Sequence, residues 1–261
     1  MSERLKKNFL SGNKLLVSYA MVGYPDFESS LKTFELLIES GSDIIEIGYP
    51  FSDPVADGST IQVAHEKALE NKIGFKEVLR AVELLRSKYP EVPLIVMTYY
   101  NPIFKIGLEK FVSSFKSAGA DGFIVPDLPP EESGELKKLA DENGLSLIML
   151  AAPTSPERRL RLICQRTGEF TYFVSVTGIT GERDTLPLEN LKRKIQVYRR
   201  VCNKKVVVGF GISKREQAKL ISSLADGIVV GSLFVKLSGK RDFEGLKKAV
   251  KELKEGLSTA S

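Results

Sequence analysis

The chain has few of the residues that build cross-linked, metal-bound or membrane-embedded proteins. It contains two cysteines, one histidine and no tryptophan among 261 residues. Two cysteines are too few for a disulfide framework, and one histidine does not support a histidine-rich zinc site. No apolar run approaches the roughly 18 residues that span a membrane, and the charged N-terminal residues do not resemble a signal peptide. We therefore expect a reduced, cytoplasmic, globular protein without a bound metal or a membrane anchor.

A strong excess of one charge is also missing. The 38 basic residues exceed the 33 acidic ones by only five. Basic residues cluster at 158–161, 192–194, 199–200 and 204–205, but no aromatic residues are interleaved with them as in a nucleic-acid platform. This pattern favours solvated helix faces over a nucleic-acid groove. A small anionic substrate would need only a local site.

What the chain does have is a regular alternation of short β-branched runs and longer amphipathic segments. Such alternation predicts parallel strands joined by crossover helices. The length fits the roughly 250 residues of a (β/α)₈ barrel, and no linker rich in Pro, Gly or Ser divides it. We predict an α/β fold, a single TIM-barrel domain over residues 1–261, with an open doubly wound sheet as the alternative. The predicted strands are Leu15–Ala20, Ile44–Ile47, Leu94–Thr98, Gly122–Val125, Ser146–Leu150, Phe170–Val174, Val206–Gly209 and Gly227–Val230. The predicted helices include Ser29–Ser40, Phe75–Lys88, Leu108–Ala118, Glu131–Asn143 and Lys214–Ser223.

A weak internal repeat supports the barrel. Residues 42–48, 120–126 and 225–231 each have a small residue, then Asp, then four strand residues, then Gly or Pro. Gly41 and Gly119 precede two of these repeats and can end the previous helix in a left-handed conformation. Repetition of a strand–helix unit fits closure into a barrel better than an open sheet.

The active site of such a barrel lies where the strands end and their loops begin. Glu46 lies within the second strand, where a carboxylate is costly unless it is paired or faces the barrel mouth. The loop that follows contains Asp53 and Asp57, and either could simply cap a turn or a helix. Three carboxylates within twelve residues favour acid–base catalysis over a structural role.

Glycine-rich turns follow the last three predicted strands, at 175–181, 209–213 and 231–232. Backbone amides in such turns and at helix N-termini bind phosphate, often after strands seven and eight of a barrel. No lysine lies at the end of a predicted strand, which disfavours a Schiff-base aldolase. The single histidine, His65, is interpreted as structural. The sequence thus predicts proton transfer by carboxylates on a phosphorylated substrate, without a cofactor.

These residues carry a resemblance to the α subunit of tryptophan synthase, over roughly Lys7 to Leu257. The most specific stretch is residues 46–58, Glu-Ile-Gly-Tyr-Pro-Phe-Ser-Asp-Pro-Val-Ala-Asp-Gly. Further matches are residues 99–102, 127–129, 178–181, 209–213 and 231–232. There are departures from some relatives at Tyr24, Ser59 and Val176, none of which bears a proposed catalytic role.

The resemblance implies retro-aldol cleavage of indole-3-glycerol phosphate to indole and glyceraldehyde 3-phosphate, without metal or organic cofactor. Glu46 would be the general acid–base, and Asp57 would bind the indole N–H. Tyr172 would support Glu46 or line the site, and Thr180 would help hold Asp57. The resemblance also implies an indole pocket formed by Tyr19, Ile61, Tyr99 and Phe210. It implies a phosphate site formed by Gly181, Gly209, Gly211, Ile212, Gly231 and Ser232. The implied partner is a pyridoxal-phosphate β subunit, which forms an α2β2 complex with this chain and receives the indole.

The sequence leaves two alternative functions open. Another phosphosugar barrel, such as an indole-glycerol-phosphate synthase or an epimerase, would share the phosphate site, but the synthase needs a lysine at a strand end. A non-catalytic barrel that regulates a partner would not need Glu46 and Asp57, and both are present.

Overall fold

Eight parallel strands close into a barrel in the computed structural model, which describes residues 2–174, 188–209 and 211–258. Each strand pairs with its neighbour in the sequence, and β1 pairs with β8 to complete the ring. The predicted (β/α)₈ barrel is therefore confirmed, and the open sheet is wrong. The strands are β1 Leu15–Met21, β2 Ile44–Gly48, β3 Leu94–Met97, β4 Gly122–Ile124, β5 Ser146–Ala151, β6 Phe170–Val174, β7 Lys205–Gly209 and β8 Gly227–Val230.

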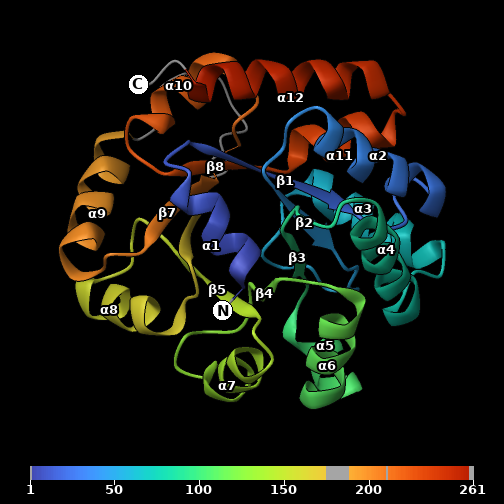
Figure 1. The fold of residues 1–261 in the computed structure, drawn as a ribbon, viewed down its shortest axis with the longest axis horizontal. Helices are drawn as coiled ribbons and strands as arrows, with labels where there is room; N and C mark the ends of the chain where they lie inside the picture. Colours follow the sequence, from blue (N-terminus) through green and yellow to red (C-terminus); the bar gives the residue numbers. More distant parts are fainter. Residues whose placement is uncertain (1, 175–187, 210, 259–261) are drawn as a thin grey trace.

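Helices surround the barrel, as Figure 1 shows, and α1 lies across one of its ends. Two predicted helices have the expected bounds, and α7 begins three residues later than predicted because Pro129–Ser133 form a turn. In the described ranges, no helix is long and apolar enough to cross a membrane. The helices are α1 Glu3–Leu10, α2 Phe27–Glu39, α3 Ser59–Glu70, α4 Phe75–Lys88, α5 Tyr100–Ile106, α6 Leu108–Ala118, α7 Gly134–Glu142, α8 Glu157–Arg166, α9 Leu188–Val201, α10 Arg215–Ser222, α11 Ser232–Gly239 and α12 Phe243–Ser258.

The barrel interior is a packed apolar core at the end covered by α1. Side chains alternate between the two faces of a strand, so every second residue points inward. One inward-pointing residue from most strands meets Leu5 and Phe9 of α1 in this core, and Phe9 packs on Phe170 with ring centroids 5.4 Å apart. The outward-pointing residues pack against the helices in a second, larger cluster. The covered end therefore has no room for a substrate, which leaves the opposite end for chemistry.

The sequence repeat has a structural explanation at the covered end. In each repeat the Asp side chain accepts a hydrogen bond from a backbone N–H group near the start of the preceding strand. The donors are Leu16 for Asp43, Leu94 for Asp121 and Val206 for Asp226, at 2.7–2.9 Å. The Asp backbone N–H donates to the carbonyl of that same residue in all three cases. These reciprocal pairs hold neighbouring strands together where the barrel begins, and they lie away from the strand ends that form a barrel active site.

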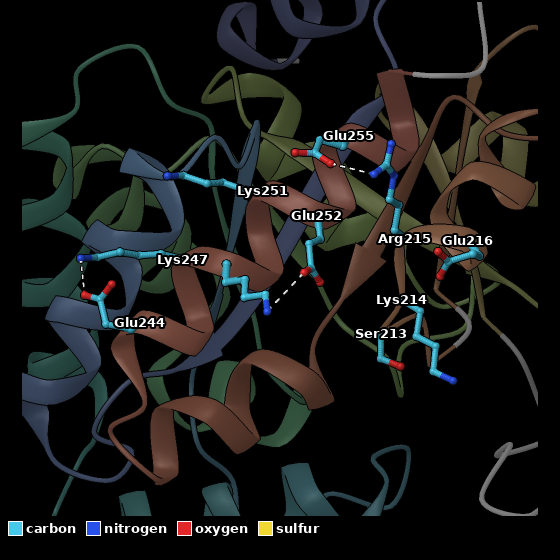
Figure 2. A pocket seen from close by; sticks show the side chains of 10 residues that line it. Ser213, Lys214, Arg215, Glu216, Glu244, Lys247, Lys251, Glu252 and Glu255 are labelled. Carbon is cyan, nitrogen blue, oxygen red and sulfur yellow. Dashed lines mark hydrogen bonds and ion pairs between the residues drawn. The ribbon is translucent and has the colours of Figure 1, made fainter.

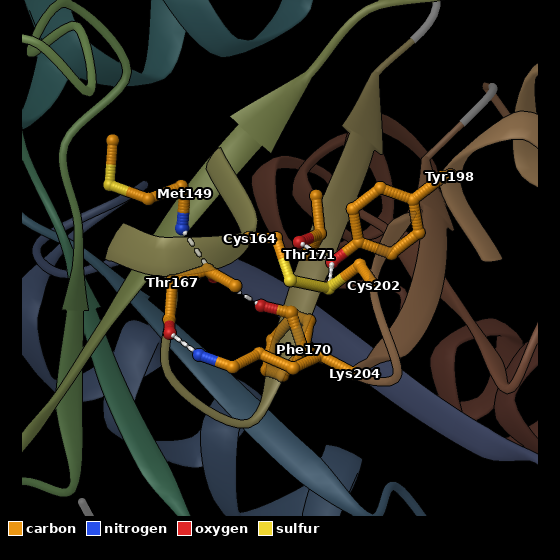
Figure 3. The surroundings of a disulfide bond; sticks show 8 residues. All are labelled: Met149, Cys164, Thr167, Phe170, Thr171, Tyr198, Cys202 and Lys204. Atoms are coloured by element: carbon orange, nitrogen blue, oxygen red, sulfur yellow. Dashed lines mark hydrogen bonds between the residues drawn. A yellow bond between two sulfur atoms is a disulfide. The ribbon is translucent and has the colours of Figure 1, made fainter. Parts of the chain in front are cut away.

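The expectation of reduced cysteines is wrong. Cys164 of α8 and Cys202, just after α9, form a disulfide with Cα atoms 5.8 Å apart (Figure 3). The Tyr198 hydroxyl lies 2.9 Å from Cys202 Sγ and 2.5 Å from the Thr171 hydroxyl of β6. The cysteines are 38 positions apart in the sequence, and this pairing could not be predicted because α8 and α9 become neighbours only when the barrel closes.

Candidate active site

Glu46 points into the barrel from the centre of β2. It follows the inward-pointing Ile44 by two residues and therefore lies one layer closer to the carboxyl ends of the strands. Its register partner on β1 is Tyr19, whose side chain must then point inward at the same level. The predicted catalytic carboxylate thus lies between the apolar core and the open end of the barrel.

The surroundings of Glu46 favour its protonated form. The residue is 1% exposed, and among the described residues its Oε1 atom has no hydrogen-bond partner. Burial raises the pKa of Glu46 from 4.5 to about 8, and the nearby charge of Asp57 adds to the rise. A carboxyl group whose pKa lies near neutral pH, and whose Oε1 atom has no partner among the described residues, can both donate and accept a proton.

Two tyrosine rings flank this layer because glycines leave room for them. A Cβ atom on Gly48 would lie 2.5 Å from the Tyr19 hydroxyl, and one on Gly209 would lie 2.5 Å from the Tyr172 hydroxyl. Burial raises the pKa of both tyrosines well above 10, so they remain neutral hydroxyl groups. Gly209, predicted as a phosphate residue, therefore also has a packing role beside Tyr172.

Asp57 lies on the loop between β2 and α3, and its side chain is 7% exposed. Tyr99, just after β3, donates its hydroxyl hydrogen bond to Asp57 Oδ2 at 2.7 Å. Burial raises the pKa of Tyr99, and the charge and the hydrogen bond of Asp57 raise it further. Asp53, the other loop carboxylate, is exposed and accepts a hydrogen bond from the adjacent Ser52 hydroxyl at 2.5 Å. The turn interpretation thus fits Asp53, whereas the side chain of Asp57 is largely shielded from solvent beside the barrel mouth.

The contacts of Asp57 include His65, which is predicted from the sequence to be structural. His65 of α3 is 3% exposed, and its Nε2 lies 3.1 Å from Asp57 Oδ2. One signal could have revealed it. His65 is four residues after Ile61, and residues at this spacing share one face of a helix. Since Ile61 is a predicted pocket residue, the same face was a candidate to meet the site.

The predicted indole-pocket residues that the structure describes converge at this mouth. A Cβ atom on Gly231 would lie 3.4 Å from Tyr19 Cδ1 and 3.6 Å from Ile61 Cδ1. The ring of Tyr99 packs on Phe51 of the Asp57 loop, with centroids 5.3 Å apart. Tyr19, Ile61 and Tyr99 thus come from three different strand–helix units to the same region. The remaining pocket residue, Phe210, lies outside the described residues.

Two backbone segments offer amide groups at the same end. Gly211 has φ +63°, a conformation that favours glycine, and a Cβ atom there would meet no atom of the described residues within 4 Å. Its neighbour Ile212 is buried. Gly231 precedes α11, which begins at Ser232, so the first N–H groups of this helix have no partner within it. Both segments are suited to an anion. Thr180 and Gly181 lie outside the described residues.

A surface groove between α10 and α12 carries no such chemistry. Figure 2 shows its charged lining on the outside of the barrel, with ion pairs of Arg215 with Glu255 and of Lys247 with Glu244, at 3.0 and 2.7 Å. Elsewhere Arg159 pairs with Glu131. Opposite charges are thus interspersed on the helix faces, as predicted.

Within the described ranges, no three His, Cys, Asp or Glu side chains gather as a metal site.

Comparison with known proteins agrees with the geometry. The family model of the tryptophan synthase alpha chain matches residues 5–260. The tryptophan synthase alpha chain of Aquifex aeolicus is 59% identical over 244 residues, which cover 94% of this chain and 93% of that one. The solved tryptophan synthase subunit alpha of Legionella pneumophila has a TM-score of 0.91 at 30% identity and covers 99% of this chain and 100% of its own. A chain of Mycobacterium tuberculosis tryptophan synthase has a TM-score of 0.90 at 34% identity, with 98% of this chain and 99% of that chain covered. The chain therefore belongs to the tryptophan synthase alpha chain family.

Proposed function

We propose that this chain cleaves indole-3-glycerol phosphate to indole and glyceraldehyde 3-phosphate. The observation that carries the proposal is Glu46, a buried carboxyl group at the open end of the barrel, with a pKa of about 8 and an Oε1 atom that has no partner among the described residues. Family membership supports the substrate and the reaction. The proposal also takes residues 1–261 as a single domain.

In the proposed reaction Glu46 moves two protons. Its carboxyl group first donates a proton to the ring carbon that carries the glycerol chain, which leaves a positive charge on the ring. The resulting carboxylate then accepts the proton of the adjacent glycerol hydroxyl as the carbon–carbon bond breaks. The bond electrons return to the ring, which releases indole and an aldehyde and restores the Glu46 carboxyl group. A pKa near neutrality suits both transfers.

Asp57 is proposed to bind the indole N–H and to stabilise the positive charge on the protonated ring. A fixed negative charge in a buried site stabilises such a charge more strongly than it would in water. Tyr19, Ile61, Tyr99 and Phe210 are proposed to line the indole pocket, and Tyr172 is proposed to support Glu46. Thr180 is proposed to help hold Asp57 once substrate is bound.

The phosphate group is proposed to bind the backbone amides after the last strands. The open space that the described residues leave at Gly211, and the first N–H groups of α11, which have no partner within that helix, support this assignment. Placing the phosphate there and the ring between Tyr19 and Ile61 would put the reacting bond next to Glu46. The proposed phosphate residues are Gly181, Gly209, Gly211, Ile212, Gly231 and Ser232.

A pyridoxal-phosphate β subunit is the proposed partner, in an α2β2 complex that passes indole onward. Val55 on the Asp57 loop is 82% exposed and Phe104 of α5 is 67% exposed, and apolar side chains in such positions are typical of an interface. We propose that this chain itself holds no metal or organic cofactor. We also propose a cytoplasmic location, because a phosphorylated substrate does not cross membranes freely.

The proposal is tested by measuring indole release from indole-3-glycerol phosphate, with and without a β subunit. We expect slow release by the isolated chain and faster release by the complex, because docking would order the loop that carries Asp57. Glu46→Gln serves as the inactive control. Indole release by wild type that does not exceed the release by this control, with both proteins folded, would overturn the proposed activity. Cleavage without activation would overturn the coupling to the partner alone.

A further inference from the structure

We propose that His65 is a positioning residue that holds the Asp57 carboxylate in its catalytic orientation. The inference rests on the proposed function of Asp57 and goes beyond it. His65 is the only histidine of the chain, and both of its ring nitrogens have a partner in the Asp57 loop. A buried histidine needs partners for its ring nitrogens in any case, but here both partners belong to the loop that carries the proposed catalytic Asp57.

The partners of the two nitrogens assign the protonation state of the ring. The backbone N–H of Phe51 donates to His65 Nδ1 at 2.9 Å. Because a backbone N–H can only donate, Nδ1 must carry a lone pair, and the proton of the neutral ring lies on Nε2. The Nε2–H group then donates to Asp57 Oδ2 at 3.1 Å. His65 therefore acts as a neutral donor to a carboxylate.

The two hydrogen bonds connect the beginning and the end of one loop to one helix. Phe51 comes soon after β2, Asp57 comes just before α3, and His65 lies on the second turn of α3. The ring also packs edge-on against Tyr99, with centroids 6.0 Å apart. Rotation of the ring would disturb both ends of the loop, so His65 couples the loop conformation to the direction of the carboxylate.

The second donor to Asp57 shows which oxygen is left for the substrate. Tyr99 donates to the same Oδ2 atom at 2.7 Å, and the backbone N–H of Ala56 donates to the Tyr99 hydroxyl at 3.0 Å. Within the described part of the chain, the hydrogen bonds to this carboxylate both end on Oδ2. His65 and Tyr99 thus hold one oxygen from two sides, which leaves Oδ1 to meet the indole N–H.

Two substitutions separate positioning from packing. His65→Phe keeps an aromatic ring and removes both hydrogen bonds. His65→Gln places an amide N–H near the former Nε2 and loses the acceptor for Phe51. Both variants should lose stability, since both leave the Phe51 N–H without its acceptor. Only His65→Phe should lower kcat, by about tenfold with little change in KM, because only it removes the donor to Asp57.

The deciding measurement is a double-mutant cycle in the full chain with its β subunit, with kcat for indole release as the readout. Adding His65→Phe to Asp57→Asn should lower kcat much less than it does in wild type, because the group that it positions is already altered. An equal loss in both backgrounds, or equal kcat losses for His65→Phe and His65→Gln, would overturn the positioning role. If the Asp57→Asn variant alone released indole with the kcat of wild type, the proposed role of Asp57 would be overturned, and that of His65 with it.

Discussion

The two ends of the barrel each contain a buried carboxylate, and their surroundings are opposite. Asp121, at the end covered by α1, accepts hydrogen bonds from the Ser2 hydroxyl, Arg4, Arg86 and the backbone N–H of Leu94. Glu46, toward the open end, has an oxygen without a partner in the described structure. A buried carboxylate that is fully paired stays charged and stabilises local geometry, whereas a buried carboxyl group with an unpaired oxygen holds its proton and can exchange it near neutral pH. The comparison indicates that hydrogen-bond partners, more than burial, distinguish the structural Asp121 from the proposed catalytic Glu46.

Matched carboxylate-to-amide substitutions test this contrast, and Glu46→Gln has the largest expected effect. The amide has the size of the carboxyl group but cannot move a proton, so indole release should fall by about 10²–10⁴-fold. Thermal unfolding should show a fold at least as stable as wild type, because the variant removes a buried group that resists ionisation. Retention of more than about a tenth of the rate would contradict the acid–base role.

The same variant also gives a pH prediction. The folded protein holds the Glu46 proton up to a pH of about 8, whereas an unfolded chain releases it near 4.5. Between these values the folded state binds more protons, so raising the pH lowers the free energy of unfolding. Relative to Glu46→Gln, wild type should lose stability from pH 4.5 to about 8 and level off above that. Denaturant titrations of both proteins across this range measure the difference, and parallel curves would contradict the raised pKa.

Asp121→Asn makes the corresponding change at the covered end. It removes the charge that pairs with Arg86, whose side chain is only 13% exposed. We expect a loss of about 3–5 kcal/mol in the free energy of unfolding, since breaking a buried pair leaves its partner uncompensated. Well below its melting temperature the variant should cleave substrate at close to the wild-type rate. A large loss of kcat without a loss of stability would reverse the assigned roles of the two ends.

The disulfide is a second stabilising element outside the site. It encloses β6 and α9, so the cross-link restricts that segment in the unfolded chain. Replacing Cys164 and Cys202 by serine should lower the free energy of unfolding by about 2–4 kcal/mol and leave KM unchanged. Adding a reductant to wild type should reproduce the loss, whereas the serine variant should not respond to it. Equal stability of oxidised wild type and the variant would assign the bond no stabilising role.

The smallest effect is expected at the phosphate site. Gly211→Leu should raise KM for the phosphorylated substrate by about tenfold, because the side chain would enter the open space beside the backbone amides. Gly211→Ala is the matched control, since it shares the cost of φ +63° but adds little bulk. Equal KM values for the two variants would attribute the effect to backbone strain. Competition by inorganic phosphate, weakened in Gly211→Leu, checks the site directly.

Much of the fold follows from local sequence patterns. All eight strands were predicted to within one residue at each end, and Phe75–Lys88 and Leu108–Ala118 were predicted with their observed bounds. These segments have strong hydrophobic periodicity, which depends only on neighbouring residues. The helices that were not named from the sequence are α1, α5, α8, α9, α11 and α12. Three of them, α1, α5 and α11, have only seven or eight residues, and packing against the barrel contributes more to such short helices than their intrinsic propensity does.

The two carboxylates of the candidate site could be picked out from the sequence, but the hydrogen bonds that they make could not. Glu46 and Asp57 stand out because a carboxylate in a buried strand and a shaped loop after it can be recognised locally. The contacts of Asp57 with His65 and Tyr99 join residues 8 and 42 positions away. Spacing along a helix indicates the face that His65 occupies, but not that the Asp57 loop folds back onto that face.

The sequence by itself determined the alternating architecture, the eight strands and the position of each carboxylate along the chain. Only the tertiary structure decided which acid is paired, which nitrogen of His65 carries the proton, and that Cys164 meets Cys202. The physical reason is the distance along the chain over which each interaction acts. Hydrophobic periodicity and turn preferences act between near neighbours, whereas desolvation, hydrogen-bond partnership and disulfide pairing depend on distances that exist only after the barrel closes.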